Sequence, residues 1–318
     1  MRPTAKARLA PALVALGLAM TPVAAAERAF VTCQNGDELS VLDLDAGTEI
    51  ARWPVPGKPA GVAAFAGGVF TVAADSKTVR RHHPATGRVT AQTVLDGGPI
   101  GVAHDAVAGR LFVSDWYHAR IWVLNAATLA HQRDLQTGAA PAGLALSGDG
   151  RFLASADRDA DQVSIFDARN LALIRRLDVG TRPFGLRFAP DGRLFVANVG
   201  SNDVTVIGAD MAGVVARFGV GHRPYGVAFS SGRAFVTNQY ADTASVVGST
   251  DLQPLKTLDT GEYPEGIDTG PETGRIVIAN WFDNTVTLVD AGTLAVIKDI
   301  ATCDGPRAFG RFVLGDME

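Results

Sequence analysis

The sequence predicts an all-β fold: a seven-bladed β-propeller with four antiparallel strands in each blade. Three observations support this prediction. A short Gly/Pro motif recurs seven times at nearly constant steps, each copy is followed by the same series of strand and turn patterns, and the two ends of the chain hold complementary parts of one repeat. Repeats of about 40 residues with four strands each are typical of propeller blades.

The recurring motif has the form Gly-x-x-Pro-x-Gly. Its proline position is occupied by Pro59, Pro99, Pro141, Pro183, Pro224 and Pro264, and in the seventh copy by Ala308. The steps between these positions are 40, 42, 42, 41, 40 and 44 residues. This regularity indicates repetition of one structural unit.

Each motif is followed by short apolar or alternating segments separated by turn residues. In the fourth repeat, segments 185–189 and 194–198 flank a Pro-Asp-Gly-Arg turn, and a polar turn then leads to the alternating segment 203–208. Asp-Ala-Gly-Thr turns at 45–48 and 290–293 lead to the fourth strand in two other repeats. Alternation between turn residues indicates β-strands, so each repeat has four of them.

The ends of the chain contain incomplete repeats. Residues 28–55 hold the second, third and fourth strands of a blade, and residues 305–314 hold only a first strand. We expect these segments to form one blade with the C-terminal strand innermost, because this pairing removes an exposed sheet edge. Residues 27–318 are therefore expected to form a single domain.

Residues 1–26 have the pattern of a secretory signal peptide. Arg2, Lys6 and Arg8 precede an apolar stretch over residues 9–20, and the alanines at 24–26 are suited to cleavage before Glu27. The apolar stretch is short for a membrane span, which needs roughly 20 residues. We therefore predict a periplasmic protein without a membrane span.

The charge of the chain does not favour nucleic acid as a partner. Removal of residues 1–26, which contain three basic and no acidic side chains, changes the net charge from −4 to −7. A mildly acidic chain without a basic run has no overall attraction to a polyanion.

The second strands resemble the YVTN family of bacterial β-propeller repeats. The matching stretches are Phe-Val-Thr-Asn at 235–238 and the longer segments 195–207 and 278–290, with variants at 112–115 and 30–33. The resemblance extends over nearly all of residues 27–318 and implies a periplasmic or extracellular seven-bladed propeller. It implies no single activity, because similar proteins include binding proteins, subunits of quinoprotein dehydrogenases, and a few lyases or lactonases.

The only two cysteines, Cys33 and Cys303, both fall in the predicted closing blade and on the same face of it. An even cysteine count in a secreted chain favours a disulfide, which here would staple the ring closed. The alternative is two neighbouring free thiols, since a disulfide requires Cα atoms within about 7 Å.

A second candidate site consists of basic and aromatic residues around the proline position. Arg182, Arg223 and Arg307 precede this position in three motifs, Phe184, Tyr225 and Phe309 follow it, and His222 adjoins Arg223. Guanidinium groups bind carboxylates and phosphates, and aromatic rings supply apolar contact area. We predict an anionic ligand or a protein partner at this end of the channel. The alternative is structural: each arginine pairs with an acid of a neighbouring blade, and each aromatic ring fills space between blades.

The loops between second and third strands supply further candidates. Trp116, Tyr117 and His118 are consecutive, Trp281 and Phe282 occupy the matching place in another blade, and Tyr240 does so in a third. Exposed aromatic residues of this kind anchor protein interfaces. The alternative is that they pack against neighbouring loops.

A ring of Asp115, Asp157, Asn198, Asn238 and Asn280 ends the second strands. Oxygen ligands in a ring can hold a cation, but Asp and Asn at such positions more often bond to nearby backbone. The sequence contains no serine-hydrolase, zinc-protease, haem-attachment or phosphate-loop motif. We therefore assign no catalytic residue, cofactor or metal site.

These observations favour a non-enzymatic binding or scaffold protein that presents its channel mouth to a protein partner or an anionic ligand. Two alternatives stay open. One is an accessory subunit of a periplasmic quinoprotein or cytochrome redox system, and the other is a propeller lyase or lactonase.

Overall fold

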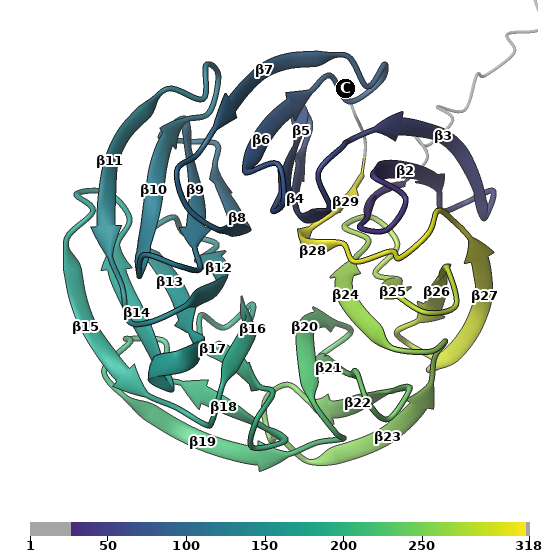
Figure 1. Cartoon of the computed structure of the whole chain (residues 1–318). Coiled ribbons are helices and arrows are strands. Elements are labelled where there is room, and N and C mark those ends of the chain that lie inside the picture. Colours follow the sequence, from purple (N-terminus) through teal and green to yellow (C-terminus); the bar gives the residue numbers. More distant parts are fainter. Residues whose placement is uncertain (1–26, 316–318) are drawn as a thin grey trace, which may run out of the picture.

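Seven β-sheets surround a central axis in the computed structural model, which describes residues 27–315 (Figure 1). The predicted all-β, seven-bladed fold is confirmed. One short 3-10 turn, η1 (Arg158–Ala160), interrupts the strands, and no helix among the described residues is long and apolar enough to cross a membrane. The signal peptide predicted for residues 1–26 lies outside the described residues.

The innermost strand begins at the proline of the motif in six blades. These strands are β4 (Pro59–Phe65), β8 (Pro99–Asp105), β12 (Pro141–Leu146), β16 (Pro183–Phe188), β20 (Pro224–Ser230) and β24 (Pro264–Thr269). Proline has no N–H group for the strand ladder, and the first residue of a strand tolerates this loss.

The second and third strands form the core of each blade and are almost entirely buried. The second strands are β1 (Arg28–Cys33), β5 (Gly68–Ala73), β9 (Arg110–Asp115), β13 (Phe152–Asp157), β17 (Leu194–Asn198), β21 (Arg233–Asn238) and β25 (Ile276–Asn280). The third strands are β2 (Glu38–Asp43), β6 (Thr78–His82), β10 (Arg120–Asn125), β14 (Gln162–Asp167), β18 (Asp203–Ile207), β22 (Thr243–Gly248) and β26 (Thr285–Asp290). Both faces of each sheet pack against neighbouring blades, which explains why these strands are buried along nearly their whole length.

The outermost strands carry the polar surface of the ring. They are β3 (Thr48–Pro54), β7 (Val89–Val94), β11 (His131–Gln136), β15 (Leu173–Asp178), β19 (Val214–Gly219), β23 (Pro254–Asp259) and β27 (Ala295–Ala301). Most of their residues are exposed, as expected for the solvent edge of a blade.

The closing blade joins the two ends of the described chain, as predicted. Its order is β29 (Val313–Leu314), β1, β2 and β3, and Ala29 pairs with Val313. The short strand β28 (Phe309–Arg311) adds a feature that the sequence did not predict, because it pairs in parallel with β4 of the next blade. Gly310 permits this approach, since a Cβ there would meet the carbonyl oxygen of Val62. Figure 1 shows the yellow C-terminal strands between the purple blade and the ring centre.

The predicted disulfide between Cys33 and Cys303 is present. It joins the end of β1 to the segment after β27, with Cα atoms 5.7 Å apart and a sequence separation of 270. The bond therefore closes the ring covalently beside the strand pairing that closes it by hydrogen bonds.

The final glycine of the motif allows the innermost strands to approach one another. A Cβ at Gly185 would meet the carbonyl oxygen of Tyr225 in the next blade, and one at Gly101 would meet that of Ala142. Only glycine leaves room for backbone this close, which explains why every copy of the motif ends with it.

Candidate functional site

The ring has two faces of different composition. We define the upper face as the one that carries the lead-in loops, which precede the innermost strands, and the turns between second and third strands. The lower face carries the turns between first and second and between third and fourth strands. The candidate residues Arg182, Phe184, His222, Arg223, Tyr225, Arg307, Phe309, Trp116, Tyr117 and Trp281 all belong to lead-in loops, to the adjoining ends of innermost strands, or to the second turns.

Side chains of the preceding blade fix the lead-in loops. The backbone N–H of Arg182 donates to Asp161 Oδ1 at 2.7 Å, that of Arg223 to Asn202 Oδ1 at 2.8 Å, and that of Tyr263 to Asp242 Oδ1 at 2.9 Å. The three donor residues have φ values of 53°, 54° and 60°, a conformation that non-glycine residues adopt only when their surroundings impose it. The residue before each proline is therefore held in a defined place.

Phe184, Tyr225 and Phe309 form an aromatic layer across the upper end of the channel. Their ring centroids lie 4.5 Å (Phe184–Tyr225), 5.0 Å (Phe184–Phe309) and 5.7 Å (Tyr225–Phe309) apart. The Phe309 ring also reaches within 3.3 Å of the place that a Cβ of Gly143 would take. All three residues are buried, so they fill the space between blades, as in the structural alternative, and close the channel from above.

Arg307 belongs to a buried polar network beneath the upper surface. Its Nε lies 2.9 Å from Glu265 Oε2, its Nη2 donates to the Tyr225 hydroxyl at 2.9 Å, and its Nη1 donates to Gln34 Oε1 at 2.9 Å. Burial raises the pKa of Glu265, and the guanidinium charge of Arg307 opposes that shift. Arg307 is thus paired with an acid of the neighbouring blade, which makes it part of the scaffold.

Arg182 and Arg223 lie nearer the surface. The Arg182 side chain is exposed, and Arg223 stacks on the Tyr240 ring, with the guanidinium carbon 4.3 Å from the ring centroid. Arg223 Nη1 also donates to the Tyr240 hydroxyl at 2.8 Å. His222, beside Arg223, is exposed as well. Arg307 is therefore buried and paired with an acid, whereas Arg182 and Arg223 lie nearer the surface.

Four aromatic residues on the upper face form a contiguous cluster, which we call the aromatic patch: Tyr240, Tyr263, Trp281 and Phe282. Tyr263 is at its centre, with ring centroids 5.5 Å from Tyr240, 5.6 Å from Trp281 and 4.8 Å from Phe282. Tyr240 is 55% and Phe282 59% exposed. Burial and the neighbouring Tyr240 raise the pKa of Tyr263 to about 12, so its hydroxyl stays neutral at physiological pH.

Sequence reasoning missed Tyr263 and Glu265, although a signal for both existed. They flank Pro264 in the positions that hold Arg223 and Tyr225 around Pro224. Tyr263 thus interrupts the row of arginines and completes the aromatic patch, while Glu265 replaces an aromatic ring and neutralises Arg307.

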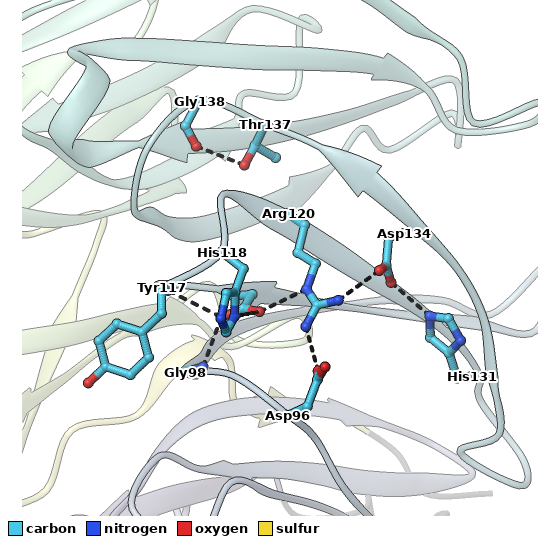
Figure 2. Close-up of polar contacts among 10 residues, drawn as sticks. Asp96, Gly98, Tyr117, His118, Arg120, His131, Asp134, Thr137 and Gly138 are labelled. Carbon is cyan, nitrogen blue, oxygen red and sulfur yellow. Dashed lines mark hydrogen bonds and ion pairs between the residues drawn. The ribbon is translucent and has the colours of Figure 1, made fainter.

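The Trp116–His118 turn lies apart from the aromatic patch. Trp116 packs against Phe184, with ring centroids 6.2 Å apart, while Tyr117 is 73% exposed. Beside this turn, Arg120 joins three carboxylates: its Nε donates to Asp115 at 2.9 Å, its Nη1 to Asp134 at 2.8 Å, and its Nη2 to Asp96. Figure 2 shows Arg120 between Asp134 and Asp96, with His118 alongside.

The Asp/Asn ring is buried and bonded within its own blades. Asp115 Oδ1 accepts the N–H of Gly98 at 2.8 Å, and Asn198 Nδ2 donates to Thr205 Oγ1 at 2.9 Å. Asn238 and Asn280 make matching bonds to Ser245 and Thr287. The Asp115 contact agrees with the turn-capping interpretation, whereas the three asparagines bond to side-chain hydroxyl groups of the third strands. Within residues 27–315, no three His, Cys, Asp or Glu side chains are grouped so that they could hold a metal ion.

Comparison with known proteins confirms the fold. The family described as "Lactonase, 7-bladed beta-propeller" matches residues 122–217, which include only two of the innermost strands, β12 and β16. The chain is similar to a functionally unknown protein from Desulfotomaculum acetoxidans, with a TM-score of 0.76, 15% identity, and coverage of 91% of this chain and 98% of that one. It is also similar to Kuenenia stuttgartiensis hydrazine synthase, with a TM-score of 0.70, 16% identity, and coverage of 80% of this chain and 89% of that one. No curated protein sequence matches. The chain is a seven-bladed β-propeller.

Proposed function

We propose that this protein is a non-enzymatic binding or scaffold propeller of the periplasm whose upper face holds a protein partner. The observation that carries the proposal is the aromatic patch with Arg223 stacked on it. Tyrosine, tryptophan and arginine are the residues that most often dominate the energy of protein interfaces. The rings of the patch are already in contact, and Asp242 of the preceding blade fixes the lead-in loop that carries Tyr263, so little side-chain freedom would be lost on binding.

Two features support the periplasmic location. The Cys33–Cys303 disulfide suits an oxidising compartment. The basic and apolar pattern of residues 1–26 is that of a secretory signal.

Cross-linking in the native host tests the proposal. A photoreactive benzoylphenylalanine replaces Tyr240 on the upper face or, as the matched control, Val107, which lies in the β8–β9 turn of the lower face and is fully exposed. We expect a discrete adduct from position 240 only, and its loss when Phe282→Ser is added. Equal adducts from both positions, or none from position 240, would contradict the proposal.

The identity of the adduct also tests the redox alternative. A cytochrome or quinoprotein cross-linked at position 240 would make this chain an accessory subunit of a redox system. Lactone hydrolysis is the remaining alternative, and the lactonase family matches only residues 122–217. This hydrolysis is measured on the purified wild-type protein with and without added divalent cations.

A further inference from the structure

The centre of the ring contains a cavity that the upper-face site does not use. Its volume is about 490 Å³, within the range of roughly 300–1,000 Å³ that is typical of small-molecule sites. Tyr225 and Phe309, two members of the aromatic layer, line its upper end, and it extends past Gly148 and Pro271 in the turns of the lower face. The cavity therefore lies below the aromatic layer and reaches the turns of the lower face.

The walls of this cavity are apolar. Small and branched side chains of the innermost strands line it, among them Val102, Ala103, Ala145, Leu186, Val227 and Ile267. His104 also faces it and packs on Phe65, with ring centroids 4.1 Å apart. Burial, reinforced by Arg81 and opposed by Asp105, lowers the pKa of His104 to about 4, so this ring is neutral at pH 7. Such walls suit the hydrocarbon part of a ligand.

Two guanidinium groups stand at the lower mouth. Arg187 donates from Nη2 to Asp268 Oδ1 at 2.8 Å and from Nε to the carbonyl oxygen of Val227 at 3.2 Å. Arg311 Nε lies 3.8 Å from the same Asp268 Oδ1, and its side chain is 68% exposed. A second hollow, of about 530 Å³, adjoins this mouth and shares Gly148, Arg187 and Arg311 with the central cavity.

The carboxylate between these two arginines is already occupied. Asp268 Oδ2 accepts the backbone N–H groups of Phe312 at 2.7 Å and Val313 at 3.0 Å. Asp268 beside Arg187 and Arg311 leaves one positive charge in excess, and in the adjoining hollow Asp149 and Asp191 pair with Arg151 and Arg193. The acid that lines the central cavity itself, Glu265, lies at its upper end and pairs with Arg307.

From this geometry we infer that the central cavity binds a small amphipathic organic anion, which enters from the lower face. The apolar chain occupies the cavity, and the carboxylate or a similar head group binds Arg311 beside Arg187 at the mouth. Guanidinium groups hold such head groups by charge-assisted hydrogen bonds. This site is separate from the upper face, and the inference does not depend on the proposed protein partner.

Calorimetric titration of the purified protein with three eight-carbon probes tests the inference. Octanoate carries a negative head group, octanol a neutral one and octylammonium a positive one. We expect octanoate to bind most tightly and octylammonium most weakly. The exposed substitution Arg311→Gln should weaken octanoate about tenfold and leave octanol unchanged, because it removes one charge-assisted contact.

A steric variant tests the route into the cavity. A Cβ at Gly148 has open space around it, so Gly148→Trp can be accommodated while its ring obstructs the mouth; Gly213, equally open but outside the cavity, provides the matched control Gly213→Trp. Gly148→Trp should abolish binding of octanoate and octanol, whereas Gly213→Trp and the upper-face variant Arg182→Ala should bind both normally. Equal affinity for the three probes, no binding at millimolar octanoate, or binding that survives Gly148→Trp would overturn the inference.

Discussion

Two arginines four residues apart, Arg307 and Arg311, show how differently the two faces of the ring use the same residue type. The side chain of Arg307, on the upper face, is 19% exposed and lies 2.9 Å from Glu265. That of Arg311, on the lower face, is 68% exposed and lies 3.8 Å from a carboxylate that Arg187 and two backbone N–H groups already share. The arginine at the upper end of the channel is therefore neutralised by its own buried acid, whereas the one at the lower end is exposed and beside a carboxylate that is already shared.

The largest expected effect comes from removal of the disulfide that closes the ring on the upper side. The double variant Cys33→Ala/Cys303→Ala should lose about 5 kcal/mol of the free energy of unfolding, because the bond restricts a very long loop in the unfolded chain. Urea unfolding measures the loss. A change below about 0.5 kcal/mol, the range of neutral surface substitutions, would mean that strand pairing alone closes the ring.

The two arginines themselves provide the next test. Arg307→Met should cost about 3–5 kcal/mol of stability, because it leaves the buried Glu265 carboxylate without its charged partner. Arg311→Met should change stability by no more than about 0.5 kcal/mol, because its side chain is mostly in solvent. Thermal and urea unfolding measure the stability of both variants. Similar losses of unfolding free energy for the two would contradict the difference between the faces.

The final glycines of the motif lie in the innermost strands, between the upper and lower faces of the ring. Gly185→Ala should cost about 1–3 kcal/mol, because its methyl group would meet the carbonyl oxygen of Tyr225 and force the strands apart. Gly148→Ala, at the lower mouth, should be close to neutral because nothing lies within 4 Å of its Cβ position. A stable Gly185→Ala protein would show that the innermost strands tolerate wider spacing.

A smaller, pH-dependent effect belongs to the Arg120 network of the upper face. Burial opposes ionisation of Asp115, but hydrogen bonds from Gly98, Arg120 and His118 lower its pKa below the ordinary value of 3.8. A lowered pKa in the folded state adds stability above the unfolded pKa, and this stability is lost as the pH falls through the folded pKa. Arg120→Gln should therefore cost about 2 kcal/mol at pH 7, and the difference from wild type should shrink as the pH falls below about 4. Urea unfolding of both proteins between pH 7 and pH 3 measures this stability difference. A difference that stays constant with pH would exclude ionised Asp115 as its cause.

The sequence predicted the architecture because each blade repeats the same local rules. Prolines that begin strands, glycines that permit close approach and buried second strands recur at each step, so one interpretation applies to the whole ring. The disulfide was predictable as well, since Cys33 and Cys303 fall in one blade and on the same face of it. The pairing of β28 with β4 was not, because a three-residue parallel bridge has no sequence pattern of its own.

The candidate site was predictable only in part. The sequence placed Arg182, Arg223 and Arg307 in equivalent slots, yet their environments depend on residues from other blades, such as Glu265 and Tyr240. Likewise, Phe184, Tyr225 and Phe309 were compatible with either an exposed surface or a core. Their contacts across the channel decide for the core, and such contacts depend on how far each ring reaches toward the axis.

The central claim is that partner binding belongs to the upper face and is independent of the lower cavity. Its most direct test is the affinity of the cross-linked partner for four purified proteins: wild type, Arg223→Ala, Phe282→Ser and Gly148→Trp. We expect Arg223→Ala and Phe282→Ser each to weaken binding at least about tenfold, the usual loss for central interface anchors, and Gly148→Trp to bind as wild type does. Unchanged affinity for both upper-face variants, together with a loss in Gly148→Trp, would contradict this claim.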